Sequence, residues 1–239
     1  MAYRAIEVGA DRFLALQWAN FAFDLCRRQV DEESALIFLK EYLAININSA
    51  ITIRKTTNQL MRLWLAYDDK YKLLREKATK LRSLHQLHLL PILHFGLAIN
   101  IFPIYKETIS IIGQLHRITT PVLSRTIADR VLEKFPNPSS IPYTVPRVLR
   151  SLENWGFISY EKGSVIIKEI SVLEEDFVNW FLLSLITALE QKEITFQELE
   201  VCPLKLGITL AHPRKVITLS TDLSLTRNAQ GVEVIGLSR

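Results

Sequence analysis

The chain has few of the residues that usually mark a catalytic or metal site. Its 239 residues include only two cysteines, Cys26 and Cys202, whose separation matches no metal or redox motif. None of the eight glycines belongs to a glycine-rich phosphate loop, and neither a nucleophile elbow nor a cysteine–histidine pair of recognisable spacing occurs. We therefore expect a non-enzyme without a cofactor, in a reducing cytoplasm where both cysteines are buried thiols.

Metal ligands and membrane-spanning segments are scarce as well. His85, His88 and His94 are close in sequence, but leucine and isoleucine surround them and no cysteine or carboxylate lies nearby. This pattern favours a partly buried histidine set over a zinc site. The apolar run 84–102 contains too many polar side chains for a membrane span and is expected to be a core helix. Met1–Asp11 lacks the pattern of a signal peptide, so we expect no membrane association.

Positive charge is concentrated in the middle of the chain, although the net charge is only +4. Residues 51–82 carry 9 basic and 3 acidic side chains, and residues 83–170 carry 9 basic and 6 acidic ones. Both ends carry more acidic than basic side chains. Binding of a polyanion would therefore centre on residues 51–170.

The hydrophobic periodicity predicts helices in the first half and a mixed structure at the end. The expected helices are 12–29, 32–43 with Asp31 as N-cap, 49–66, 70–82, 84–102 with a kink or break at Pro91, and 106–116. The tail is expected to contain a helix at 173–189 and strands at 216–219, 223–226 and 232–237.

The middle of the chain has the element order of a winged helix-turn-helix, spanning about residues 106–170. Thr120 and Pro121 are expected to start a helix that runs to about residue 135, and the turn 136–140 follows it. Thr144 is expected to cap a second helix, which ends at Trp155. Two β-prone runs, 157–160 and 164–168, then form a hairpin with its turn at 161–163.

These elements predict a mainly α fold with small β-hairpins, of the α+β class. Residues 1–82 would be a helical N-terminal domain with a second helix-turn-helix. Residues 83–170 would be the apolar helix plus the winged helix-turn-helix, and residues 171–239 a C-terminal α+β extension.

One side of the second winged helix carries the residue types that contact DNA. Arg147, Arg150, Ser151 and Asn154 share this side, and none of them is acidic. Arginine binds phosphate or guanine edges and asparagine reads adenine in the major groove. Lys162 at the hairpin tip is placed for a further phosphate contact. We predict binding of double-stranded DNA through these residues together with Tyr143 and Thr144 at the helix start.

A second set of candidate DNA contacts lies on the helix predicted at 49–66. It consists of Arg54, Lys55, Asn58 and Arg62, which precede the basic run 70–82. Charged residues on a long helix also serve simply to solvate one face, and the sequence leaves both interpretations open.

The string from Tyr143 to Ile158, YTVPRVLRSLENWGFI, resembles the recognition helix and first wing strand of bacterial winged helix-turn-helix regulators. That superfamily commonly shows Ser/Thr-Val, an arginine, two leucines, Leu-Glu, and glycine followed by a hydrophobic residue and isoleucine. Pro146 stands where a small polar residue is usual. With its flanking elements the resemblance covers about 60 residues.

The wider layout is similar to the BrxA family of BREX phage-defence systems. Ser49, Thr52 and Arg54 match a Ser-x-x-Thr-x-Arg/Lys helix in the helical half of that family, and an apolar helical region and a winged domain follow. The similarity covers about residues 30–160 and leaves the tail from Leu173 unmatched. It implies a non-catalytic, DNA-binding accessory protein of a bacterial defence system.

Two alternatives to DNA binding remain open at this stage. Winged helices also serve as protein-interaction and dimerisation modules, so the chain could be an adaptor or a homodimer within a defence or regulatory complex. It could also be a transcription regulator with a ligand pocket among the apolar, histidine-containing helices.

Overall fold

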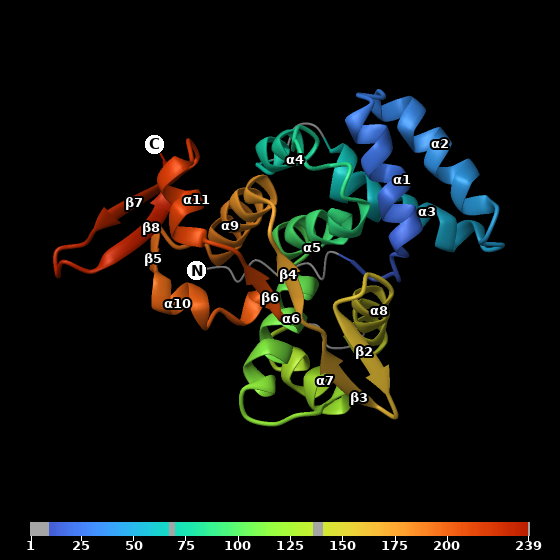
Figure 1. Ribbon diagram of the computed structural model, residues 1–239. Coiled ribbons are helices and arrows are strands. Elements are labelled where there is room, and N and C mark those ends of the chain that lie inside the picture. The colour runs from blue at the N-terminus through green and yellow to red at the C-terminus, as the bar shows by residue number, and fades with distance from the viewer. Residues whose placement is uncertain (1–9, 67–69, 136–140, 239) are drawn as a thin grey trace, which may run out of the picture.

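The computed structural model describes residues 10–66, 70–135 and 141–238. The fold is α+β, mostly helical with small sheets, as the sequence predicts. Figure 1 shows three groups of elements around a central helix, α5: a helical group at the N-terminus, a helix-and-hairpin group in the middle of the chain, and a mixed group at the C-terminus.

The N-terminal group contains the predicted helices with small changes in their bounds. They are α1 (Leu16–Arg27), α2 (Glu32–Ala44), α3 (Ala50–Leu60), which continues as a π-helix (Met61–Leu65), and α4 (Lys72–Ala78). Two polar caps fix the helix starts. The Asp31 carboxylate accepts from the backbone N–H of Ser34, and the Ser49 hydroxyl accepts from that of Thr52.

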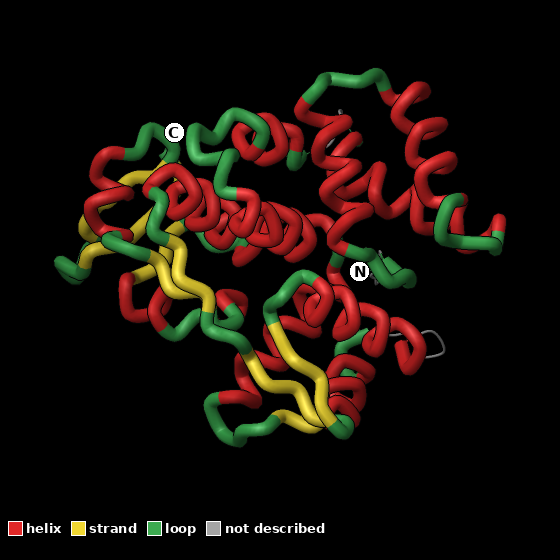
Figure 2. Tube along the Cα trace, turned by 45° about the vertical axis from the view of Figure 1, so that its right-hand side comes forward, coloured by secondary structure: helices red, strands yellow, loops and turns green. Residues whose placement is uncertain are grey.

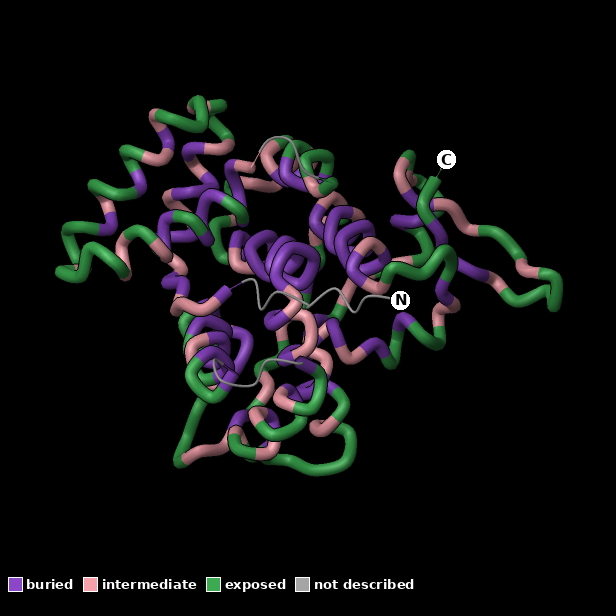
Figure 3. The backbone as a smooth tube through the Cα atoms, turned by 180° about the vertical axis from the view of Figure 1, so that it is seen from behind, coloured by how far each residue is buried: buried purple, intermediate pink, exposed green. Residues whose placement is uncertain are grey.

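Helix α5 (Leu90–Ile101) is apolar on every side and is buried along almost its whole length. The helix expected from residue 84 begins only at Leu90, after a 3-10 turn (Leu87–Leu89). Pro91 therefore lies in the first turn of α5 and neither kinks nor splits it. Close packing against α9 (Glu175–Leu189) requires Gly96, because a Cβ at this position would lie 2.6 Å from the ring of Trp180. Figure 3 shows buried backbone concentrated at this centre.

Helix α6 (Pro103–His116) leaves α5 at a bend of 109°. Among the described residues no single helix has the length and apolar character to cross a membrane, and only this bent pair, taken together, passes such a test. Helix α5 buries almost all of its residues inside the protein, and α6 buries half of its residues.

The middle group contains helix α7 (Ser124–Leu132) and helix α8 (Ile141–Asn154) with strands β1 (Val122–Leu123), β2 (Ile158–Glu161) and β3 (Ser164–Ile167). The strands pair antiparallel in the order β1-β3-β2. Two residues connect β2 to β3, Lys162 and Gly163, and both have positive φ, as a tight hairpin turn demands.

Two expected helix starts in this group are wrong. Thr120 and Pro121, which are joined by a cis peptide bond, precede β1 and do not start a helix; helix α7 begins at Ser124. Thr144 is not an N-cap, because α8 already begins at Ile141 and Thr144 is buried inside it. The expected turn 136–140 lies outside the described residues.

The C-terminal group contains α9 and two small sheets, and α9 contacts β8 of the three-stranded one (Figure 2). Strands β4 (Ile170–Val172) and β6 (Ile208–Leu210) pair parallel, and β5 (Glu193–Thr195), β7 (Leu223–Arg227) and β8 (Glu233–Leu237) pair antiparallel in the order β5-β8-β7. The remaining elements are α10 (Phe196–Glu200), a 3-10 turn (Pro203–Lys205) and α11 (Pro213–Leu219). The strand expected at 216–219 is therefore wrong, since these residues end α11 after Pro213 starts it.

The buried apolar side chains form one cluster that runs from Ala10 to Ile235. It passes through both expected domain boundaries, at residues 82–83 and 170–171, because α4 and α9 both contact α5. The three groups therefore share a core, and this core fixes how α3 and α8 lie relative to each other.

His94 forms the polar centre of this core. The indole Nε1 of Trp64 donates to His94 Nδ1 at 3.0 Å, so the proton of the neutral ring is on Nε2, which donates to the side-chain oxygen of Asn20 at 2.7 Å. His94 is fully buried, and this burial lowers its pKa from 6.5 to about 3. The other two histidines of the predicted set, His85 and His88, are exposed.

We predict that His94 makes the protein less stable as the pH falls from about 6.5 to about 3. The unfolded chain takes up a proton at His94 in this range and the folded protein does not, so one group costs up to about 1.4 kcal/mol per pH unit. Urea unfolding of the wild type and of His94→Gln measures the difference. His88→Gln is the exposed control, and an unchanged pH dependence in His94→Gln would contradict the assignment.

Candidate nucleic-acid interface

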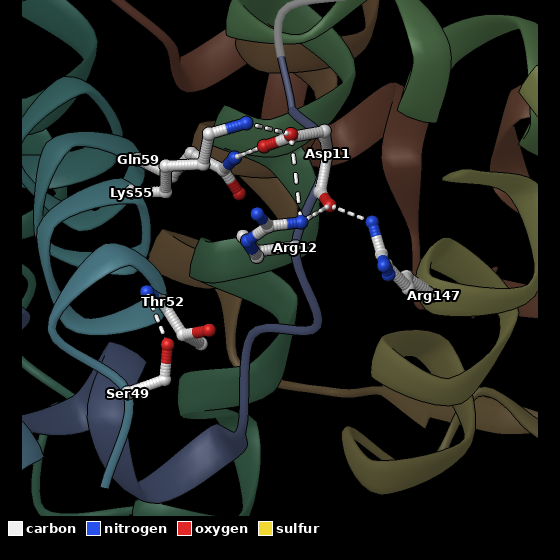
Figure 4. A network of polar contacts seen from close by, with 7 residues as sticks. All are labelled: Asp11, Arg12, Ser49, Thr52, Lys55, Gln59 and Arg147. Atoms are coloured by element: carbon white, nitrogen blue, oxygen red, sulfur yellow. Dashed lines mark hydrogen bonds and ion pairs between the residues drawn. The ribbon is translucent and has the colours of Figure 1, made fainter. Parts of the chain in front are cut away.

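The chain enters the fold as an extended segment, although the sequence predicts a helix from Arg12. Helix α1 begins only at Leu16, and Ala15 before it has extended backbone angles. We call residues 10–15 the N-terminal segment. Leu14 at its centre is fully buried, so the segment is part of the core. Figure 4 shows it lying between α3 and α8.

The N-terminal segment covers part of the α8 face that the sequence predicts to read DNA. The backbone N–H of Leu14 donates to the Ser151 hydroxyl at 2.9 Å, and that of Leu16 donates to the Asn154 side-chain oxygen at 2.6 Å. In return the indole of Trp155 donates to the Leu14 carbonyl at 2.8 Å. Ser151 is fully buried. Ser151 and Asn154 therefore serve to dock the start of the chain on α8; Ser151 is closed off from solvent, whereas Asn154 stays exposed with its side-chain oxygen engaged.

The two arginines on this face are placed differently from each other. Arg147 is half-buried, and its Nη1 donates to the backbone carbonyl of Asp11 at 2.6 Å. Arg150 is exposed, and its guanidinium carbon lies 4.7 Å from the centre of the Phe13 ring. No carboxylate pairs with either arginine within the part of the chain that the structure describes. Both side chains therefore keep N–H groups that an anion can accept from.

Asp11 links the N-terminal segment to α3. Its carboxylate accepts from Lys55 Nζ and from Gln59 Nε2, each at 2.8 Å, and it lies 3.5 Å from Arg12 Nη1 (Figure 4). Burial raises the pKa of Asp11, but the hydrogen bonds and positive charges of Lys55 and Arg12 outweigh it, so the pKa lies below the usual value. Asp11 is therefore ionised near pH 7 and fixes α3, the segment and α8 together.

A cavity of about 450 Å³ lies beside the N-terminal segment, between α3 and α8. Three arginines line it together with aromatic, hydroxyl and apolar side chains: Arg12, Phe13, Trp18, Ile47, Thr52, Thr56, Pro146, Arg147 and Arg150. None of these described lining residues is acidic. Three buried polar atoms of the lining have no hydrogen-bond partner: Arg12 Nε, Trp18 Nε1 and Thr56 Oγ1. The cavity therefore combines positive charge with unused hydrogen-bonding groups.

The remaining predicted site residues fall into exposed and engaged groups. Tyr143 on α8, Lys162 at the hairpin tip, and Arg54 and Asn58 on α3 are exposed. Three further predicted site residues contact the protein itself. Lys55 on α3 forms an ion pair with Asp11, and the guanidinium of Arg62 lies 5.4 Å from the centre of the Phe102 ring. Thr144 is buried inside α8 and faces no solvent.

The sequence did not single out the residues that connect the two predicted basic faces. The sequence predicts that Arg12 and Phe13 start a helix, and it gives no role to Asp11. Trp18 gave the one available signal, because it falls off the apolar stripe of α1 and so needs a second neighbour. The structure provides that neighbour as the Phe13 ring, whose centre lies 5.6 Å away in edge-to-face geometry.

Other kinds of site receive little support from the described residues. Among them no group of three or more histidine, cysteine or acidic side chains could hold a metal ion. His94 itself is enclosed by Trp64, Asn20 and the aromatic rings of Phe23 and Trp155. A cavity of about 380 Å³ lies at the other end of α5, next to Ile99 and Ile101, so the ligand pocket expected among these helices stays a prediction.

Comparisons of the chain with protein-family models, curated proteins and solved structures give no significant match. The resemblances to winged regulators and to the BrxA family therefore stay predictions. The arrangement of the arginines, the N-terminal segment and the cavity is what bears on function.

We predict that Ser151→Ala destabilises the fold by about 1–3 kcal/mol, because it leaves the buried N–H of Leu14 without an acceptor. Chemical denaturation measures the change. Ser171→Ala, at an exposed position on β4, should alter stability little. Equal stability of the two variants would show that the N-terminal segment is not docked on α8.

Asp11→Asn should lower the free energy of unfolding by about 1 kcal/mol near pH 7, since the ion pairs with Lys55 and Arg12 are lost. The folded pKa of Asp11 is depressed, so its contribution exists above the unfolded pKa and disappears as the pH falls through the folded value. The variant and the wild type should therefore converge in acid, once the pH is below the depressed folded pKa of Asp11. A difference that stays constant with pH would contradict the ion pairs.

Proposed function

We propose that the protein binds double-stranded DNA without catalysis and holds it through backbone phosphates. The observation that carries the proposal is a cavity between α3 and α8 that is lined by three arginines, one from the N-terminal segment and two from α8, and, among the described residues, by no acidic side chain; the basic faces predicted on α3 and α8 flank it. The sequence predicts these faces as separate DNA contacts, and in the structure they lie on either side of the N-terminal segment (Figure 4).

The topology of the middle group supports a winged helix-turn-helix as the scaffold. A helix, a short strand, two helices and a hairpin follow one another, and the first strand pairs with the last to give the order β1-β3-β2. In such domains the hairpin and the second helix both contact DNA. Here Lys162 at the hairpin tip and Arg150 on α8 are the exposed cations of those two elements.

The covered part of α8 determines the kind of contact that we propose. Sequence is read by side chains that reach base edges, whereas phosphate contacts carry no sequence information directly. Ser151 and Asn154 are occupied by the N-terminal segment, so base reading through them is not part of the proposal. Arg54, Arg150 and Lys162 are exposed and suited to phosphates. We therefore expect weak sequence preference and strong salt dependence.

The cellular role follows from the resemblance to the BrxA family and is part of the same proposal. It would be that of an accessory component of a bacterial phage-defence system, or of a regulator. Both roles require DNA binding and neither requires an active site.

A second candidate function, an adaptor between proteins, is favoured by one observation. Leu123 on β1 pairs with Ser164, and Ile166 lies two residues further along β3, so both side chains point to the same side of the sheet. Leu123 is 55% exposed and Ile166 is 38% exposed. An apolar sheet face in contact with water suits a protein partner.

DNA binding is tested by the salt dependence of affinity for a short duplex of random sequence. We predict that Arg54→Ala combined with Arg150→Ala weakens binding and reduces the slope of log K against log salt by about 2, because two phosphate contacts are lost. Both side chains are exposed, so the variant should fold normally.

Lys192→Ala combined with Arg227→Ala is the matched control, since it removes the same charge from exposed positions in the C-terminal group. It should leave the slope unchanged. Absence of duplex binding by the wild type, or equal losses in the two double variants, would overturn the proposal. Loss of binding to a co-purified protein in Leu123→Ser, without any duplex binding, would favour the adaptor function.

A further inference from the structure

We propose that the cavity between α3 and α8 is a binding site for a phosphate group. Its affinity for phosphate is argued from the cavity alone, and only the idea that DNA supplies the phosphate rests on the proposed function. The site lies between the N-terminal segment, α3 and α8 and has a volume of about 450 Å³. This volume is within the range of about 300–1,000 Å³ that is typical of ligand sites.

The charge around the cavity selects an anion. Arg12, Arg147 and Arg150 line it. Lys55 lies nearby and forms an ion pair with the same Asp11 carboxylate as Arg12. Asp11 is the one acidic side chain paired with any of these four cations in the described part of the chain. Its carboxylate faces Lys55 and Arg12, so it leaves the charges of Arg147 and Arg150 uncompensated.

The number and kind of hydrogen-bonding groups favour phosphate over a carboxylate. Each guanidinium has five N–H donors. Arg147 uses Nη1 for the Asp11 carbonyl, and Arg12 uses Nη1 for the same carbonyl, while Arg150 has no hydrogen bond to a described residue. A carboxylate has two oxygens, whereas a phosphate presents three or four and pairs with arginine through two parallel bonds.

Three further groups in the lining are buried and unpaired, which is unusual in a folded protein. They are the Nε of Arg12, the indole Nε1 of Trp18 and the hydroxyl of Thr56. Trp18 is 9% exposed and Thr56 only 1% exposed. Unpaired buried donors of this kind cost free energy in the empty site, and a bound anion that accepts from them removes this cost.

The site is held rigid before any ligand arrives. The Asp11 carbonyl fixes Arg147, the Phe13 ring supports Arg150, and Phe13 itself packs edge-to-face against Trp18. Rigid placement reduces the entropy that binding must overcome. A DNA backbone and a free phosphorylated compound both carry such a phosphate and share the chemistry that this cavity recognises.

The test is calorimetric titration of the full chain with sodium pyrophosphate, against sodium chloride of equal ionic strength. We expect saturable binding of one pyrophosphate in the wild type. Thr56→Val keeps the side-chain shape but removes the hydroxyl, and Arg150→Gln removes a charge. Each should weaken pyrophosphate binding about tenfold or more, because a hydrogen bond to a charged group is lost. Thr56→Val should be at least as stable as the wild type, since it loses an unpaired buried hydroxyl.

Arg227→Gln is the matched control, because Arg227 is an exposed arginine of β7 in the C-terminal group that does not line the cavity. It should bind pyrophosphate within twofold of the wild type. No saturable binding, or equal binding by Thr56→Val, Arg150→Gln and the wild type, would overturn the proposal.

A duplex-binding assay on the same samples separates this inference from the proposed function. Duplex binding without pyrophosphate binding would overturn the phosphate site and leave DNA binding intact. Pyrophosphate binding without duplex binding would support the site with a free phosphorylated compound as its ligand and overturn the DNA proposal. Competition by pyrophosphate beyond that of chloride would support the site and identify the DNA backbone as the source of the phosphate.

Discussion

A helix that is apolar on every side must be covered on every side, and α5 imposes this constraint on the whole protein. The π-helix and α1 cover one side, α6 another, and α4 and α9 the rest. Gly96 allows α9 to approach closely enough for Asn100 to donate to the carbonyl of Ser184 at 3.0 Å. Because elements from all three parts of the chain meet on one helix, the positions of α3 and α8 are fixed by the core.

The N-terminal segment turns this shared core into a defined site. The backbone N–H and C=O of Leu14 pair with the side chains of Ser151 on α8 and of Trp155 just after it, and the Asp11 carboxylate pairs with side chains of α3. An extended strand with few neighbours of its own needs such external partners, because a buried backbone group without a partner is costly. The same contacts that satisfy the segment place Arg12 and Phe13 at the wall of the cavity.

Local signals in the sequence were enough to predict most helices and the hairpin, but the positions of the site residues depend on contacts between residues far apart in the sequence. Asp31 and Ser49 cap their helices through bonds within three residues, and Lys162-Gly163 forms a turn from its own backbone preferences. Residues 12–15 have the apolar spacing of a helix, yet they are extended because Ser151, more than 130 positions away, accepts from Leu14. The spacing of the arginines predicts that they share one face of the helix. Their different partners, the Asp11 carbonyl for Arg147 and the Phe13 ring for Arg150, depend on that same distant contact.

The placement of these two arginines bears on the mode of nucleic-acid binding. A helix that reads bases has to enter a groove with a continuous polar face, and burial of Ser151 interrupts that face at its centre. Phosphates lie outside the grooves and are reached by single long side chains, so an interrupted face still binds them. An exposed arginine held by an aromatic ring loses less freedom on binding than one that moves freely in water. The packing that buries Ser151 is therefore more compatible with the proposed phosphate contacts than with base reading through α8.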